Sequence, residues 1–185
     1  MIEELLQDAD ERMAKSVDAT RHEFNSVRTG RASPALLDRI SVDYYGAATP
    51  LNQLATISAP EARLLTIQPY DKSSIKAIER SILESDLGLT PSNDGNLIRL
   101  AIPELTEERR KEMVKVVRHI CEDGRVAIRN IRRDVMHDLR ELRDAGEAGS
   151  DDEHRAEGEL QKLTDAKIAD LEQALKYKEA EILEV

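Results

Sequence analysis

Aromatic residues are nearly absent from this chain of 185 residues, which has one Phe, four Tyr and no Trp. Any hydrophobic core must therefore be aliphatic, and the side chains on which unpaired bases stack are scarce. A nucleic-acid partner would have to be recognised through its phosphates and its shape. The length suits one or two small domains better than one large enzyme fold.

Several other features are missing as well. The single cysteine, Cys121, excludes an internal disulfide and is expected to be a partly buried thiol in a reducing compartment. There is no run of about 18 apolar residues and no secretory leader, so we expect a soluble, unprocessed, cytoplasmic protein. The four His residues lack metal-ligand spacing, and neither a nucleophile elbow nor a phosphate-binding glycine loop is present. We therefore predict no enzymatic activity, no metal site and no cofactor.

Three long segments have the 3.6-residue periodicity of amphipathic helices. The first runs from Ile2 to Val27, the second from Thr106 to Ala145, and the third begins at Ser150 with a capping-box pattern, Ser150-Asp-Asp-Glu153. In the second helix the apolar positions share one arc: Met113, Val117, Ile120, Gly124, Ile128, Ile131, Val135 and Leu142. A glycine on this arc predicts the close approach of the first or the third helix. Together the three helices predict a bundle.

Between the first two helices the pattern changes to short β-rich runs at residues 40–45, 64–67 and 97–102. A short helix is expected between the last two runs, capped by Ser73 or Ser74 and burying Ile75, Ile78, Ile82 and Leu83. Asn93–Asn96 is typical of a hairpin turn. We predict an α+β protein in which residues 1–29 and 105–185 form a discontinuous three-helix bundle and residues 30–104 form a small inserted β/α/β sandwich domain. The two chain crossings predict a hinge at Thr29, Gly30, Arg31, Pro103, Glu104 and Leu105.

The second long helix is basic although the whole chain has a net charge of −10. From Arg109 to Arg133 there are nine Lys or Arg residues and three carboxylates, whereas residues 146–185 have five basic and twelve acidic residues. Most of the basic side chains point away from the apolar arc. Such a local excess favours a polyanionic partner, most simply RNA. The alternative is a charged helix whose arginines pair with carboxylates of its own turns or of the neighbouring helices.

Five motifs resemble the bacterial ribosome recycling factor family, and they are found in order along nearly the whole chain. They are Val27-Arg-Thr-Gly-Arg-Ala-Ser-Pro34, Val42-Asp-Tyr-Tyr-Gly46, Asp86-Leu-Gly-Leu-Thr-Pro-Ser-Asn-Asp-Gly95, Leu105-Thr-Glu-Glu-Arg-Arg-Lys111 and Arg125-Val-Ala-Ile-Arg-Asn-Ile-Arg-Arg-Asp134. The resemblance implies an L-shaped molecule, similar in outline to a transfer RNA. It also implies a non-enzymatic factor that acts with elongation factor G and GTP to split post-termination ribosomal complexes, releasing ribosomes from mRNA for reuse.

The same resemblance implies that the arginine-bearing helix lies on large-subunit ribosomal RNA in the space between the subunits. From the motifs and the basic pattern we predict the rRNA-binding residues Arg110, Lys111, Arg118, Arg125, Arg129, Arg132 and Arg133. A monomer without membrane contact is expected. Two alternatives remain open, namely a coiled-coil scaffold that self-associates and a hydrolase acting on RNA.

Overall fold

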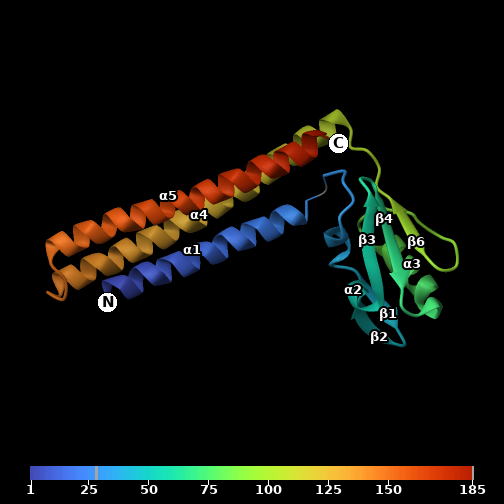
Figure 1. Ribbon diagram of the computed structural model, residues 1–185, viewed down its shortest axis with the longest axis horizontal. Helices are drawn as coiled ribbons and strands as arrows, with labels where there is room; N and C mark the ends of the chain where they lie inside the picture. The colour runs from blue at the N-terminus through green and yellow to red at the C-terminus, as the bar shows by residue number, and fades with distance from the viewer. Residues whose placement is uncertain (28, 185) are drawn as a thin grey trace. The chain divides into compact units, whose positions relative to one another are not determined.

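The computed structural model describes residues 1–27 and 29–184 (Figure 1). The chain divides into two compact units. The first unit contains Met1–Val27 and Lys111–Ala180, and the second contains residues 29–110 and 181–184 of the described chain. The first unit is entirely helical, whereas the second holds every strand that the described chain forms.

The first unit is built from three long helices, α1 (Ile2–Asn25), α4 (Glu107–Asp144) and α5 (Ser150–Glu184), which run side by side in Figure 1. All three helices were predicted from the periodicity, and all three are confirmed. Thr106, with which the predicted second helix begins, caps α4, because its hydroxyl accepts a hydrogen bond of 3.1 Å from the Arg109 amide. Two acidic residues then occupy the first turn, where the helix dipole favours negative charge.

The buried face of α4 differs from the predicted arc at two places. Ile120 and Leu142 are only half-buried, and Cys121 and Leu139 are buried instead. Cys121 lies about 40° around the helix from Val117, whereas Ile120 lies about 60° to the other side. Leu142 is on the arc but in the last turn of α4, beyond Leu139, the last buried residue of the helix. The thiol is fully rather than partly buried, and burial raises the pKa of Cys121.

Gly124 lies where both neighbouring helices come close to α4. A Cβ atom added at Gly124 would lie 2.6 Å from Thr20 Oγ1 of α1 and 3.0 Å from Leu171 Cδ1 of α5. The Thr20 hydroxyl is held in place, because it donates a hydrogen bond of 3.0 Å to the Ser16 carbonyl. The predicted close approach is confirmed, and it involves both helices.

The turn between α4 and α5 does not use the predicted capping box. The carboxylate of Glu153, which is 7% exposed, accepts hydrogen bonds of 2.8 and 3.2 Å from Arg143 Nη1. A charged guanidinium is a stronger donor than a backbone amide, so Glu153 pairs with Arg143 rather than capping the helix. This ion pair, in which Glu153 is buried and Arg143 is 42% exposed, joins the end of α4 to the start of α5.

The second unit contains two antiparallel sheets, one with the order β1-β2 and one with the order β3-β4-β6-β5. The expected runs near residues 40–45, 64–67 and 97–102 became β1, β4 and β6, and the expected hairpin turn joins β5 to β6. The elements are β1 (Ser41–Tyr44), β2 (Ala47–Pro50), β3 (Ala55–Glu61), β4 (Leu64–Pro69), β5 (Pro91–Asn93), β6 (Ile98–Ala101), α2 (Leu51–Leu54), α3 (Ile75–Glu84) and the 3-10 turns η1 (Pro34–Leu37) and η2 (Lys72–Ser74).

The core of this unit is aliphatic, as the composition requires. Residues of α3, β4 and β6 share it: Ile75, Ile78, Ile82, Leu65, Ile67, Ile98 and Leu100. Leu83, which was predicted to be buried, is 59% exposed because it is one residue beyond Ile82 and therefore faces solvent. Alternation along β4 buries Leu65 and Ile67, so that the intervening side chains lie on the other face of the sheet.

Ser74 occupies the N-cap position of α3, as predicted, but its side chain forms no capping hydrogen bond. Asp71, the N-cap of the preceding turn η2, organises the approach to α3. Its carboxylate accepts hydrogen bonds from the Ser73 amide at 2.9 Å, from the Ser73 hydroxyl at 2.7 Å and from the Tyr44 hydroxyl at 3.1 Å. The bonds from Ser73 lower the pKa of Asp71, because they stabilise its ionised form. One carboxylate thus connects β1 to the start of η2 and α3.

Replacing Asp71 by Asn is expected to lower the thermal stability of the protein at neutral pH. A carboxyl with a lowered folded-state pKa stabilises the fold above its unfolded pKa of about 3.9, and this contribution is lost as the pH falls through the folded-state value. The difference between the two proteins should therefore shrink in acid, as followed by thermal unfolding from pH 7 downwards. The control is Asp43→Asn, which removes an exposed carboxylate of β1 next to Tyr44. A difference for Asp71→Asn that is independent of pH would contradict this role.

Candidate nucleic-acid interface

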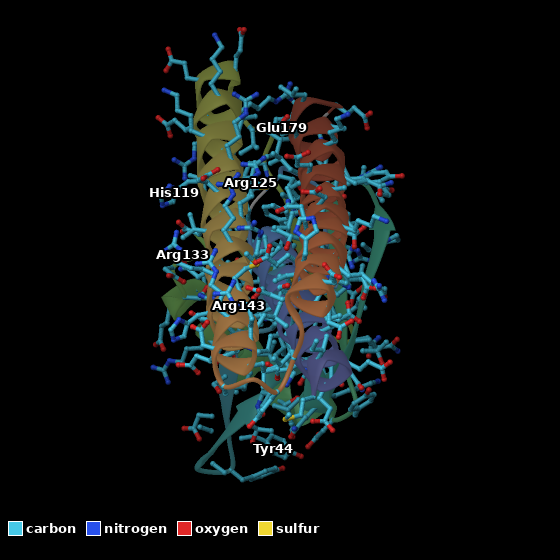
Figure 2. The ribbon with its side chains drawn as sticks, turned by 90° about the vertical axis from the view of Figure 1, so that its left-hand side faces the viewer. Tyr44, His119, Arg125, Arg133, Arg143 and Glu179 are labelled. Atoms are coloured by element: carbon cyan, nitrogen blue, oxygen red, sulfur yellow. The ribbon has the colours of Figure 1, made fainter. Side chains whose placement is uncertain are left out.

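Many of the basic side chains of α4 lie on one flank of the helix, which begins beside α5 and continues outward to the side away from it. At about 100° per residue they fall within an arc of roughly 100°. We call this surface the basic face and define it as Arg118, Arg125, Arg129, Arg132, Arg133 and Arg140. Figure 2 shows Arg125 between α4 and α5, whereas Arg133 projects from α4 away from α5.

Two of these arginines are bound to α5. Arg118 Nε lies 2.7 Å from Glu179 Oε1, and Arg125 Nε lies 3.5 Å from Glu172 Oε1. The Arg125 side chain is only 20% exposed. Burial lowers its pKa, but the hydrogen bond to Glu122 and the nearby carboxylates outweigh burial, so that the pKa of Arg125 is raised. Arg118 and Arg125 therefore each have a carboxylate partner on α5, although the Arg118 side chain is still 64% exposed.

The remaining arginines have few carboxylates around them. Arg129 Nη1 lies 3.7 Å from Glu122 Oε1, and this pair is exposed and therefore weak. Within the described chain, no carboxylate lies within ion-pair distance of Arg132 or Arg133. The Nε atom of Arg132 is buried and has no hydrogen-bond partner among the described residues. Within the described chain these arginines therefore have no carboxylate within ion-pair distance or, at Arg129, only an exposed one.

The two predicted residues at the start of α4 are placed differently. Arg110 is half-buried and belongs to the second unit, and its buried Nε atom also has no hydrogen-bond partner in the described chain. Lys111 is exposed and is the first residue of this helix in the first unit. Lys111 lies seven residues before Arg118 and therefore two turns earlier on the same flank of the helix, whereas Arg110 is rotated by about 100° from Lys111 and lies outside that flank.

The sequence reasoning missed Arg140, an exposed residue on the basic face. Its signal was present, because Arg140 lies seven residues after Arg133 and therefore two turns further along the same flank. It was overlooked because the search for basic residues ended at Arg133. With Arg140 the basic face extends over a longer part of α4.

The predicted hinge residues also come together. Five of them line one cavity of about 30 Å³, namely Thr29, Gly30, Arg31, Pro103 and Leu105, together with Leu36, Leu89 and Ile102. Gly30 has a φ of +77°, a conformation that glycine adopts without strain. Glu104 is the exception, since it forms an ion pair of 2.7 Å with Arg63. The two crossing segments are therefore neighbours within the second unit.

The histidines show no sign of metal chemistry. His119 lies 3.5 Å from Asp123 and His137 lies 3.1 Å from Glu141, and all four side chains are exposed. Over residues 1–27 and 29–184, no group of three or more His, Cys, Asp or Glu side chains is arranged to hold a metal ion. In the same residues, no helix has the length and apolar character needed to cross a membrane.

Fold and surface together define an α+β binding protein whose basic helical face suits an extended polyanion. Comparison with protein families makes this more specific. The family model for ribosome recycling factor matches residues 20–183. The chain therefore belongs to the ribosome recycling factor family, as its motifs predicted.

Ribosome recycling factors of known sequence or structure are similar to this chain over nearly its whole length. The chain is 59% identical to the ribosome-recycling factor of Rubrobacter xylanophilus over 97% of both sequences, and 57% identical to that of Halalkalibacterium halodurans over the full length of both. A solution structure of a ribosome recycling factor matches with a TM-score of 0.80 and 41% identity, covering 100% of this chain and 98% of the other. A second structure presents the T. thermophilus ribosome recycling factor and the E. coli elongation factor G bound to the E. coli post-termination complex. It has a TM-score of 0.70 and 48% identity, over 99% of both chains.

Proposed function

We propose that this protein binds the bacterial ribosome after termination and splits the complex together with elongation factor G and GTP, so that ribosomes leave the mRNA and are reused. Membership of the ribosome recycling factor family supports this function, as does the similar structure in which such a factor accompanies elongation factor G on a post-termination complex. The family consists of non-enzymatic translation factors, and this chain is not an enzyme. We place its action in the cytoplasm, where ribosomes are found.

The observation that carries the RNA-binding part of the proposal is the lack of carboxylate partners for Arg132 and Arg133 in the described chain. Planar guanidinium groups bind phosphate oxygens in a bidentate manner without reading bases. A rigid helix that presents several of them at fixed spacing can follow the backbone of folded RNA. We therefore assign large-subunit rRNA binding to Arg129, Arg132, Arg133 and Arg140. Arg118 and Arg125 contribute less, because α5 already provides their partners.

We further propose that the bundle consists of residues 1–29 and 105–185, that residues 30–104 form the inserted domain, and that the crossings at Thr29–Arg31 and Pro103–Leu105 are a hinge. Support comes from the cavity at which both crossings meet and from the positive φ of Gly30. A small cavity lets the two segments shift without first breaking a close-packed contact. The energy for the motion comes from the GTPase partner.

Replacing Gly30 by Pro is expected to slow splitting about tenfold while leaving ribosome binding within threefold, since proline fixes φ near −65° and cannot adopt the value of +77° found here. Splitting rates and binding constants would be measured on the same ribosomes. Gly88→Pro, another positive-φ glycine of the second unit, is the matched control. Equal loss of splitting in both variants would argue against a hinge at Gly30.

The proposed function is tested by light scattering of post-termination ribosomes mixed with the protein, elongation factor G and GTP. Scattering should fall only when all components are present. An undiminished signal, with a functional recycling factor as positive control, would refute the recycling role. A concentration-dependent dimer without ribosome affinity would favour the scaffold alternative.

A further inference from the structure

The flank of α4 opposite the basic face is acidic and lies beside α1. Arg12 Nη2 of α1 lies 3.3 Å from Asp134 Oδ2, which fixes this flank of α4 next to α1. Arg12 is also 3.6 Å from Asp8, so one cation is shared between two carboxylates. Asp138 and Glu141 lie on the same flank of α4 as Asp134, so that this half of the helix carries acidic residues on one flank and arginines on the other.

The acidity is concentrated in a groove between the start of α1 and the end of α4. The groove has a volume of about 440 Å³ and is lined by Met1, Glu4, Leu5, Asp138, Glu141, Leu142 and Ala145. Three of these seven residues are carboxylates and none is Lys or Arg, so that the amino terminus of Met1 is the one positive group among these lining residues. We call this surface, together with Asp8 and Asp134, the acidic groove.

We propose that the acidic groove determines how the bundle is oriented on RNA. By repelling phosphates, it disfavours every orientation except the one in which the basic face contacts the RNA. This inference rests on the proposed binding of rRNA by the basic face. With the basic face toward RNA, the carboxylates of the groove lie on the side away from the phosphates. If the bundle were rotated so that α1 faced the RNA, Glu4, Asp138 and Glu141 would lie close to the phosphates and repel them.

The helix is wide enough that a phosphate near one flank interacts mainly with the charges of that flank. An α-helix with its side chains is about 10–12 Å across, and the Debye length at physiological salt is about 8 Å. A phosphate close to one flank is therefore largely screened from the other. The protein attracts RNA on one side and repels it on the other, and its negative total charge suppresses contact with RNA in any other orientation.

The test compares two double variants with the same change in charge. Asp138→Asn/Glu141→Gln neutralises the groove, and Glu159→Gln/Asp170→Asn neutralises two exposed carboxylates of α5. Affinity for a short RNA duplex unrelated to ribosomal RNA would be measured by fluorescence anisotropy at about 50 mM salt, where electrostatic effects are large. The groove variant should bind roughly fivefold more tightly than the natural protein, and the α5 variant less than twofold more tightly.

An equal gain in both variants would overturn the proposal, because net charge alone would then govern RNA contact. No gain in the groove variant would overturn it as well. Ribosome affinity, measured in parallel, should change less than twofold in the groove variant, because the groove faces away from rRNA in the specific complex. If the natural protein failed to bind ribosomes, the proposed function would be wrong, while the comparison on duplex RNA would still decide whether the groove repels RNA.

Discussion

Reversing the charge of Arg132 with an Arg132→Glu substitution is expected to weaken binding to bacterial ribosomes about 100-fold at roughly 100 mM salt. One phosphate contact is lost, and a carboxylate is placed where a phosphate should lie. Arg132 has no ion-pair partner in the described chain, so the loss should come from the RNA contact and not from a broken contact within the bundle. Binding would be measured by a titration of labelled protein with ribosomes at several salt concentrations.

The control for this experiment is Arg155→Glu, the same charge reversal at an exposed position of α5. Its affinity should stay within threefold of the natural protein, and the helical circular dichroism of both variants should be unchanged. The salt dependence of binding should become shallower only for Arg132→Glu, by roughly one phosphate contact. Undiminished binding of Arg132→Glu would remove Arg132 from the interface, and equal losses in both variants would mean that net charge dominates.

Gly124→Val is expected to destabilise the protein by about 3 kcal/mol, at the upper end of the range for overpacked cores. A Cβ at this position would lie 2.6 Å from Thr20 Oγ1, and the hydrogen bond from Thr20 to Ser16 limits how far that side chain can move. The clash should outweigh the better helix propensity of valine, which is worth well under about 1 kcal/mol relative to glycine. Chemical and thermal unfolding would measure the effect.

Gly158→Val provides a close control, because Gly158 also lies inside a helix but has no atom within 4 Å of an added Cβ. Its stability should remain within about 0.5 kcal/mol of the natural protein, as for most surface substitutions. A second comparison uses Gly124→Ala alone and together with Thr20→Ala. Removing the Thr20 hydroxyl should make the Gly124→Ala substitution less destabilising than it is in the natural background. Equal destabilisation at Gly124 and Gly158 would show that helix propensity, not the helix contact, controls stability at Gly124.

The helices could be predicted from sequence because their signal is local and repeated over many turns. Thr106 and the apolar residues of α4 gave both its start and its buried side. The errors at Ile120 and Leu142 arose because several residues at three- and four-residue spacing compete for one face. Only packing against the neighbouring helices decides between them, and here it selects Cys121 and Leu139.

The smaller strands were harder to predict, again for physical reasons. The strand β3 lies at the edge of its sheet and contains Ser58 and Pro60, so it lacks the alternation of a half-buried strand. The strands β2 and β5 are short and are stabilised by their partners across the sheet rather than by their own residues. Because these strands depend on their partner strands, their own residues do not predict them.

The candidate interface shows the same limit. The spacing along α4 placed its arginines on one flank, but it did not reveal which of them form ion pairs with carboxylates of α5. Glu172 and Glu179 lie far from Arg125 and Arg118 in the sequence, and only the bundle brings each pair together. The structure thereby separates Arg118 and Arg125, which have carboxylate partners on α5, from Arg132 and Arg133, for which we propose the contacts with RNA.

Directed hydroxyl-radical cleavage of rRNA tests most directly whether α4 is the side that meets the large subunit. An iron chelate would be attached to a single exposed cysteine, introduced as Val126→Cys on α4 or as Ala19→Cys on α1. The buried Cys121 is protected from the reagent. We predict strong cleavage of large-subunit rRNA from position 126 and much weaker cleavage from position 19. Equal cleavage from both positions, or stronger cleavage from position 19, would contradict binding through the basic face.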